Sequence, residues 1–341
     1  MKAVAIESHG LDGVVFTDVA DPTPGAGEVV VGVRAAGLNH LDLWTLSGNL
    51  GIEHHFPHVL GADAAGEIAA VGEGVRGLRP GLPVVVNPAL SCGACEFCRA
   101  GEQSVCTTFR MLGEHVQGTF AEAVVVPATN VFPFPDHLSM PEAAALGVTF
   151  ITAYRMLFRR ARMRPGEWVL ITGIGGGLAQ SLFQLARPLA GRVFVTSSSD
   201  DKLQKAAEMG ADHGVNYEAE DVGVAVRRLT GKRGVDVALD SAGGPALDGS
   251  LRALRRGGRL VVAGATAGPK GEVDLRRVFW NQLEIIGATM GSHADVSDML
   301  RMVAGARLKP RIGRTYPLSE GRQALASLQA HDSFGKIVLV V

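Results

Sequence analysis

The chain has 341 residues, of which 33 are basic and 34 acidic, so its formal net charge is −1 at pH 7. This balance gives no reason to expect nucleic acid or a charged membrane surface as a partner. No apolar stretch reaches the roughly 18 residues of a transmembrane helix, and residues 1–6 are too short for a secretory signal, so we expect a cytoplasmic protein. The length fits two domains, and 44 glycines with 47% hydrophobic residues are typical of a packed α/β enzyme.

The first 127 residues predict a β-rich domain. Short apolar or alternating runs at residues 2–6, 13–18, 28–36, 66–71, 83–87 and 120–126 are separated by Gly, Pro and Asp. Those residue types mark tight turns between strands. A Pro-rich stretch at residues 131–137 then marks a boundary. After it, Ser139 and Glu142 have the spacing of a capping box that opens a helix.

All four cysteines lie in one window of this first part, with the spacing Cys92-x2-Cys95-x2-Cys98-x7-Cys106. In an intracellular chain, four thiols this close predict a tetrahedral zinc site in preference to disulfides. A shell of four cysteines leaves no open coordination position, so this zinc would hold a loop in place and take no part in catalysis. A nucleic-acid-binding zinc ribbon is disfavoured because no basic patch surrounds the cysteines.

A strand, a glycine-rich turn and a helix follow one another between residues 167 and 189. The apolar run at residues 168–171 leads into the cluster Gly173-Ile-Gly-Gly-Gly177, and apolar residues then recur at helical spacing. Glycines in such a turn let a pyrophosphate approach the unpaired N–H groups at the start of the helix. The motif is not a full G-x-G-x-x-G, since Leu178 stands where the last glycine would be.

The same alternation continues to about residue 290. Strand-like runs at residues 192–196, 214–217, 235–240, 259–263 and 283–288 enclose helix-like segments near residues 200–210, 220–230 and 245–255. Short strands that alternate with helices form a parallel, doubly wound sheet. We therefore predict a dinucleotide-binding domain over residues 128–290. Residues 291–341, which end in a strand-like run, are expected to return to the first domain.

Seven motifs, in their order along the chain, resemble the medium-chain dehydrogenase/reductase superfamily, which includes zinc alcohol dehydrogenases and quinone reductases. They are residues 36–44, residues 61–66, the cysteine window, residues 118–122, the glycine turn, residues 257–264 and residues 334–339. The resemblance implies an α/β fold in which a GroES-like β-rich catalytic domain with a structural zinc lobe (residues 1–127 and 291–341) encloses a Rossmann domain (residues 128–290). It also implies an NAD(P)-dependent oxidoreductase of a small-molecule substrate that forms a homodimer or homotetramer.

The chain departs from the superfamily at the ligands of the catalytic zinc. Zinc alcohol dehydrogenases have a Cys, a His–Glu pair and a further Cys or Asp where this chain has Asn39, Ala62–Asp63 and Val148. Alanine and valine cannot bind a metal, so we expect the usual catalytic zinc to be absent.

Asn39, Asp42 and Trp44 instead resemble the quinone-reductase branch, which has no catalytic metal. The resemblance implies that these three residues line the catalytic site. The Asn39 amide would then orient or polarise the oxygen of a quinone or enone, which spreads the arriving charge over its own π system. A turn residue and a helix cap are the structural alternatives for Asn39 and Asp42.

The position that distinguishes NAD from NADP lies at the end of the second Rossmann strand, about 20 residues past the glycines. Ser197 falls there in place of an acidic residue, and Lys202 follows. A hydroxyl leaves room for a 2′-phosphate that Lys202 would neutralise, so we predict NADP(H), with NAD(H) as the alternative. By resemblance, the rest of the cofactor cleft is formed by Thr149, Gly176, Gly177, Leu178, Gly264 and Lys336, and Lys336 would contact the pyrophosphate.

Three functions are compatible with these residues. The first is an NAD(P)H-dependent reductase of a quinone, an enone or an activated carbonyl, with a structural zinc only. The second is an alcohol dehydrogenase whose second metal is held by Asp63 and some of the histidines 40, 54, 55, 58 and 115. The third is a non-catalytic NADPH-binding protein.

Overall fold

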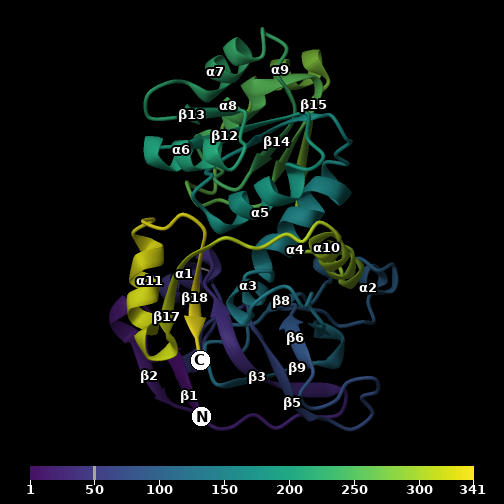
Figure 1. The fold of residues 1–341 in the computed structure, drawn as a ribbon, viewed down its shortest axis with the longest axis vertical. Coiled ribbons are helices and arrows are strands. Elements are labelled where there is room, and N and C mark those ends of the chain that lie inside the picture. The colour runs from purple at the N-terminus through teal and green to yellow at the C-terminus, as the bar shows by residue number, and fades with distance from the viewer. Residues whose placement is uncertain (49–50) are drawn as a thin grey trace. The chain divides into compact units, whose positions relative to one another are not determined.

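The structure is a computed structural model that describes residues 1–48 and 51–341. These residues divide into two compact units (Figure 1). Unit 1 contains Met1–Ile151 and Met290–Val341, and unit 2 contains Thr152–Thr289. Unit 2 is therefore inserted in the chain between two parts of unit 1, and the last segment of the chain returns to the first domain.

Unit 1 is built mainly of β-strands. Its largest sheet has the order β10-β6-β5-β3-β18-β17, with β9 also paired to β3, and the smaller sheets are β2-β1-β4 and β7-β8. The strands are β1 (Lys2–Ile6), β2 (Val14–Asp18), β3 (Glu28–Gly37), β4 (His58–Val59), β5 (Ala65–Val71), β6 (Pro83–Val86), β7 (Ala89–Leu90), β8 (Arg110–Met111), β9 (Ala123–Pro127), β10 (Val131–Phe132), β17 (Ile312–Pro317) and β18 (Lys336–Val340).

Helices are few and short in this unit and lie between the strands or beside the sheets. They are α1 (His40–Ser47), α2 (Glu96–Arg99), α3 (Met140–Ala144), α10 (His293–Gly305) and α11 (Gly321–Gln329), with 3-10 turns η1 (Leu11–Gly13), η2 (Gln103–Val105), η3 (Ala128–Asn130) and η5 (Leu318–Glu320). The β-branched residues of the strands fill the core, in which Val31, Ile68 and Phe120 are almost completely buried. Burial of these side chains fixes which face of each strand points inward.

Residues 128–151 belong to unit 1, although the sequence predicted that the second domain begins at residue 128. Strand β10 pairs with β6, and α3 packs against β3 and β5, so the sheet of unit 1 holds this segment. The predicted capping box is confirmed. Ser139 N donates to Glu142 Oε2 at 2.7 Å, and Glu142 N donates to Ser139 Oγ at 3.4 Å.

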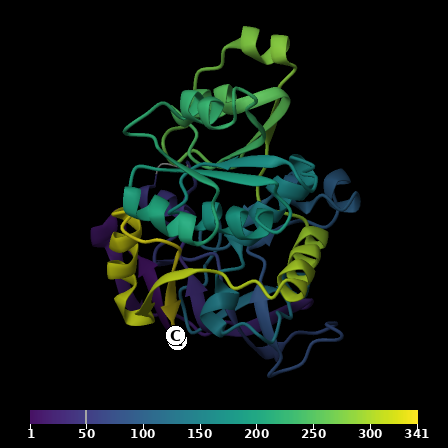
Figure 2. The same ribbon diagram turned by 45° about the horizontal axis from the view of Figure 1, so that its top comes forward.

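Unit 2 contains a six-stranded parallel sheet with the order β13-β12-β11-β14-β15-β16. Figure 2 shows this sheet between layers of helices. The strands are β11 (Trp168–Ile171), β12 (Arg192–Ser197), β13 (His213–Asn216), β14 (Val235–Asp240), β15 (Leu254–Val262) and β16 (Glu284–Gly287). The helices are α5 (Gly177–Ala186), α6 (Asp200–Glu208), α7 (Val222–Leu229), α8 (Ala246–Ala253) and α9 (Leu275–Asn281). The predicted α/β class, with a GroES-like β-rich domain and a Rossmann sheet, is confirmed.

Helix α4 (Val148–Tyr154) continues into a π-helical turn, η4 (Arg155–Arg160), and spans the division between the two units.

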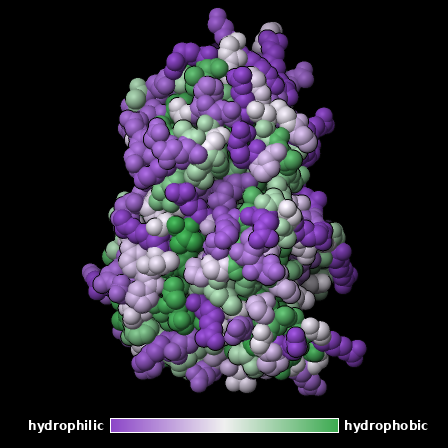
Figure 3. Space-filling view, in the orientation of Figure 1, coloured by the Kyte–Doolittle hydropathy of each residue, from purple (hydrophilic) through white to green (hydrophobic). Residues whose placement is uncertain are grey.

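None of the helices in the described residues is long and apolar enough to cross a bilayer. On the face of the molecule drawn in Figure 3, hydrophilic residues predominate and apolar residues form small separate groups.

Candidate functional site

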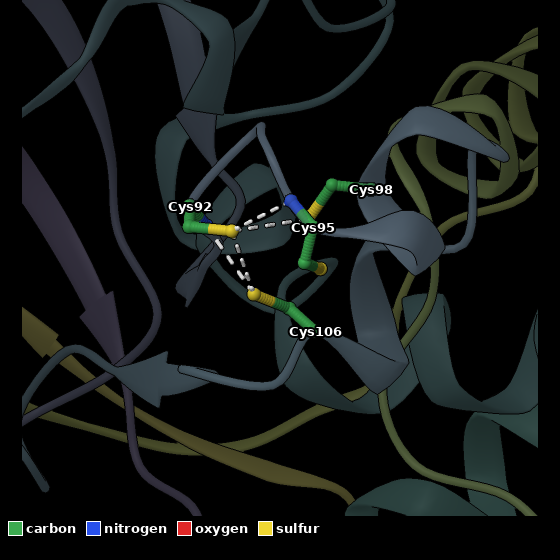
Figure 4. Close-up of side chains that lie close together, drawn as sticks. All are labelled: Cys92, Cys95, Cys98 and Cys106. Atoms are coloured by element: carbon green, nitrogen blue, oxygen red, sulfur yellow. Dashed lines mark hydrogen bonds between the residues drawn. The ribbon is translucent and has the colours of Figure 1, made fainter.

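The four cysteines come together in a lobe of unit 1 that follows β7 (Figure 4). Their Sγ atoms all lie within 4.8 Å of one another, and Cys92 Sγ is 3.9 Å from Cys98 Sγ and 3.6 Å from Cys106 Sγ. Zinc–sulfur bonds of about 2.3 Å in a tetrahedron separate the sulfurs by about 3.8 Å. The cluster therefore has the size of a zinc-thiolate shell.

Backbone amides favour the thiolate form of Cys95 and Cys106, whereas burial raises the pKa of the Cys98 thiol to about 11. Cys95 N donates to Cys92 Sγ at 3.3 Å, and Cys92 N donates to Cys106 Sγ at 3.3 Å. Amides of Cys98 and Thr107 lower the pKa of the Cys95 thiol to about 6. Thiolates are the form that binds zinc, so the donor set fits the predicted structural metal.

The cysteines are the only group of three or more metal-binding side chains found in residues 1–48 and 51–341. The histidines considered for a second metal do not form such a group with Asp63. His58 Nε2 is paired with Gly113 O at 3.1 Å, while Asp63 is bonded to Lys336 and Asn39. The geometry thus offers no three-ligand histidine centre in the described part of the chain.

A buried polar cluster lies where β3 leads into α1 and where β18 begins. It contains Asn39, Asp42, Asp63 and Lys336, whose exposed fractions are between 0 and 6%. The antiparallel pairing of β18 with β3 places Val338 opposite Gly37 and so brings Lys336 beside Asn39. Charged side chains that are this deeply buried require partners, because desolvation strongly disfavours an isolated ion.

Lys336 provides the cation of this cluster. Its ammonium donates to Asp63 Oδ2 at 2.9 Å, to Asn39 Oδ1 at 2.6 Å and to Leu38 O at 2.6 Å. Three acceptors match the three hydrogens of an ammonium group. Lys336 was expected to contact the cofactor pyrophosphate, and in this structure its charge is instead satisfied inside unit 1. The pyrophosphate contact stays a prediction.

Asp63 is the anion that joins three segments. Oδ2 accepts from Lys336 and from Asn39 Nδ2, the latter at 2.9 Å, while Oδ1 accepts from Val148 N at 2.6 Å at the start of α4. Glycines make room for this carboxylate, since a Cβ on Gly37 would lie 3.1 Å from Oδ2 and one on Gly147 would collide with Oδ1. From its sequence context Asp63 was predicted only as a possible metal ligand, and its pairing with Lys336 was not predicted.

The amide of Asn39 is fully occupied by the same cluster. Its Oδ1 accepts from Lys336, and its Nδ2 donates to Asp63 Oδ2 and to Gly37 O at 3.2 Å. The expected role of this amide as a donor to the substrate oxygen would require one of these bonds to be given up. In the geometry observed, Asn39 positions Asp63 and Lys336.

Asp42 forms a capping box with Asn39 at the start of α1. Its Oδ2 accepts from Asn39 N at 2.7 Å. Burial raises the pKa of the Asp42 carboxyl to about 7, although the Asn39 amide and the Lys336 ammonium act in the opposite direction. The helix-cap role considered for Asp42 is therefore present. Trp44 lies half-buried on the same helix, with its ring centroid 6.3 Å from that of His40, and takes no part in the cluster's hydrogen bonds.

Unit 2 contains six of the predicted cofactor residues: Gly176, Gly177, Leu178, Ser197, Lys202 and Gly264. Gly176 caps α5, so Gly177 and Leu178 begin the helix and their N–H groups have no acceptor within it. Gly173 enters the turn with a φ of 68°, which favours glycine. Gly264 follows β15, where a side chain would collide with Ser241 O. The glycine turn thus has the geometry of an anion-binding helix start.

Ser197 and Lys202 lie on different parts of this site. Ser197 ends β12, and its Oγ accepts from Ser199 N at 3.1 Å. Lys202 lies over the glycine turn, because a Cβ built on Gly175 would be 2.8 Å from its Cδ and 3.1 Å from its Nζ. The ammonium is therefore close to where a pyrophosphate would approach α5. Thr149, the remaining predicted residue, lies in unit 1 and donates from Oγ1 to Ala145 O at 3.2 Å.

Comparisons with known proteins agree with this architecture. Residues 25–136 match the alcohol dehydrogenase GroES-like domain, and residues 177–305 match the zinc-binding dehydrogenase family. The chain therefore belongs to the medium-chain dehydrogenase/reductase superfamily. It is an NAD(P)-dependent oxidoreductase.

Two relatives with different reactions are about equally similar to this chain in sequence. An acryloyl-coenzyme A reductase of Metallosphaera sedula is 32% identical over 99% of both chains. An NAD-dependent alcohol dehydrogenase of Saccharolobus solfataricus is 30% identical over 100% of both chains. The crystal structure of an NAD-dependent alcohol dehydrogenase, 42% identical, superposes with a TM-score of 0.95 and full coverage of both chains. Similarity alone thus supports the class of enzyme without selecting the substrate.

Proposed function

We propose that this protein is an NAD(P)H-dependent reductase that transfers hydride to a conjugated acceptor: a quinone, an enone or an α,β-unsaturated thioester. We also propose that it carries a structural zinc on its four cysteines and no catalytic metal. The single observation that supports this function best is the Lys336 ammonium bound by Asn39 and Asp63.

The bonds of Lys336 occupy the side-chain atoms that could otherwise bind a catalytic zinc. Of the four residues that correspond to ligands of a catalytic zinc, only Asn39 and Asp63 carry a donor atom, and both face the ammonium. A second cation placed there would meet a like charge at short range. A catalytic zinc needs three protein ligands and an open position, so these residues do not fit one.

A substrate that spreads negative charge over its own π system suits such a site. The nicotinamide, when bound, supplies the hydride, and the protein has to bind and orient the two reactants. Unit 2 offers the first amides of α5 and the Lys202 ammonium to a pyrophosphate. The buried cluster of unit 1 would position the ends of β3, β18 and α4 around the substrate.

Assays with purified protein test this function directly. We expect oxidation of NADPH or NADH with quinones, enones or enoyl thioesters, and about one zinc per chain by elemental analysis. Oxidation of simple alcohols with NAD(P)+ that is lost when a metal other than the four-cysteine zinc is removed would contradict the proposal. It would favour the second candidate, an alcohol dehydrogenase, which the names of several relatives support. Tight cofactor binding without any turnover would instead favour a non-catalytic protein.

Cofactor preference gives a sharper prediction at Ser197. Replacing Ser197 with aspartate is expected to lower the ratio of kcat/KM for NADPH to that for NADH by about tenfold or more, because a carboxylate repels a 2′-phosphate and accepts from a ribose hydroxyl. Steady-state kinetics with both cofactors measure the ratio. An unchanged ratio would show that Ser197 does not contact the adenosine ribose.

Lys202→Gln serves as the matched variant in the same assay. If Lys202 neutralises the 2′-phosphate, KM rises for NADPH alone. If it contacts the pyrophosphate, as its position over Gly175 favours, KM rises equally for both cofactors.

We further propose that the protein is a homodimer or a homotetramer whose subunits meet at β16. This strand ends the parallel sheet, and the adjoining helix α9 exposes Leu275, Phe279 and Trp280 at 66 to 71%. An open strand edge beside an apolar patch is an assembly surface in many proteins. We expect light scattering to give at least twice the chain mass of 35.7 kDa, and Trp280→Glu to reduce it. A monomer at micromolar concentration would contradict this proposal.

A further inference from the structure

Two histidines outside the cluster of Lys336 lie side by side at the far end of α1. His9 follows β1, and His54 lies in the segment before β4. His9 Nε2 is 3.2 Å from His54 Nδ1, and their ring centroids are 5.4 Å apart at an interplanar angle of 68°. His9 also packs against Gly48, where an added Cβ would lie 2.7 Å from the imidazole. The backbone at the end of α1 thus holds the His9 ring in place.

Hydrogen bonding fixes which nitrogen of His54 carries the proton. His54 Nε2 lies 2.9 Å from Glu114 O, and a carbonyl oxygen can only accept. Nε2 therefore carries the hydrogen, so His54 Nδ1 accepts and His9 Nε2 donates in the hydrogen bond between the two rings. When His9 carries its hydrogen on Nδ1 instead, the lone pairs of His9 Nε2 and His54 Nδ1 face each other and can bind one cation. A histidine ligand commonly donates its second ring nitrogen to a backbone carbonyl in this way, because that bond sets its tautomer and orientation.

The spacing of the two nitrogens matches that of two ligands on one metal ion. Metal–nitrogen bonds of about 2.0–2.1 Å separate two nitrogens by about 2.9 Å in an octahedron and by about 3.4 Å in a tetrahedron. The observed 3.2 Å lies between these values. His9 is exposed and His54 half-buried, so water can complete the coordination.

A third histidine lies beside the pair. The ring of His58 lies 4.6 Å from that of His54 between centroids. His58 Nε2 is paired with Gly113 O at 3.1 Å, so this nitrogen is not counted as a ligand.

We propose that His9 Nε2 and His54 Nδ1 form a second metal site, for a borderline divalent cation such as Zn2+ or Ni2+, that joins the end of β1 to the segment before β4. Imidazole nitrogens suit these ions, and the site would be weaker than the four-cysteine shell because it has two protein ligands. It is separate from the cluster of Lys336, since Gly48 and Asn39 cap opposite ends of α1, about 13 Å apart along a helix. The inference does not depend on the proposed function.

Calorimetric titration with Zn2+ tests the site in protein that already carries one zinc per chain. We expect one further ion to bind, and binding to weaken by about tenfold or more in His9→Gln and in His54→Gln. His55→Gln, an exposed neighbour, is the matched control and should bind as the original protein does. Equal binding by all four proteins, or no second binding event, would overturn the proposal.

A thermal shift provides a second readout that does not depend on heats of binding. Added Zn2+ should raise the Tm of the original protein and of His55→Gln, because a ligand of the folded state stabilises it. His9→Gln should show no such shift. Because His9 is exposed, this variant is expected to fold, so a shift as large as that of the original protein would also overturn the proposal.

Discussion

Replacing Lys336 with methionine is expected to lower the free energy of unfolding by about 3–5 kcal/mol, since the change leaves the Asp63 carboxylate buried without its cation. Methionine preserves most of the side-chain volume, so loss of packing contributes little. Urea denaturation followed by circular dichroism measures the effect. Lys309→Met is the matched control, because Lys309 is 60% exposed and its pairing with Glu142 at 3.7 Å is screened by water.

A double-mutant cycle separates the ion pair from general damage to the site. Asp63→Asn alone leaves the ammonium without its anion and is expected to destabilise the protein as well. In the double variant both charges are removed, so its loss of stability should be smaller than the sum of the single losses by at least about 2 kcal/mol. Additive losses would mean that the charges of Lys336 and Asp63 are not coupled, contrary to the geometry observed.

Replacing Cys98 with serine is expected to reduce bound zinc from about one ion per chain to near zero and to lower the Tm by about 10 °C. Cys98 is buried among the other three thiols, and its loss breaks a four-ligand shell. Elemental analysis gives the zinc content, and scanning calorimetry gives the Tm. The same protein should be cut by trypsin in residues 91–110, where the metal no longer holds the chain.

Ser91→Ala provides the control for this experiment, since it changes the same lobe without removing a thiol. It should keep its zinc and its Tm. If Cys98→Ser retained about one zinc per chain, the zinc would not be bound by the four cysteines.

Sequence patterns predicted the larger features of this fold because those features depend on local periodicity. The parallel sheet of unit 2 follows from apolar runs that alternate with helical segments, and the cysteine cluster follows from spacing within 15 residues. The predicted boundary after residue 127 differs from the division after Ile151 in the structure. A Pro-rich stretch resembled a linker, and only the pairing of β10 with β6 shows that the chain continues in unit 1.

The cluster around Lys336 could not be derived from local patterns. Lys336 and Asn39 are separated by 297 positions, and the register between β18 and β3 decides that they meet. One signal was available: Asp63 stands in an apolar run, Gly-Ala-Asp-Ala-Ala, and a charge in such a run needs a partner. The resemblance to metal enzymes predicts metal ligands at this position, whereas the partner of Asp63 is the Lys336 ammonium. Similarly, the placement of Lys202 over the glycine turn depends on its rotamer, which a sequence does not specify.

The position of β18 in the sequence also determines when the largest sheet of unit 1 can form during synthesis. This strand, formed by five of the last six residues of the chain, lies between β3 and β17 in the largest sheet of unit 1. During synthesis, all of unit 2 leaves the ribosome before β18 exists. The edge of β3 at residues 35–37 and the Asp63 carboxylate therefore lack these partners until residues 336–340 have been made. Synthesis of unit 1 starts before that of unit 2, but the sheet of unit 1 is completed only after unit 2 has been made. A nascent chain that stops before Lys336 contains every other residue of the buried cluster without its cation.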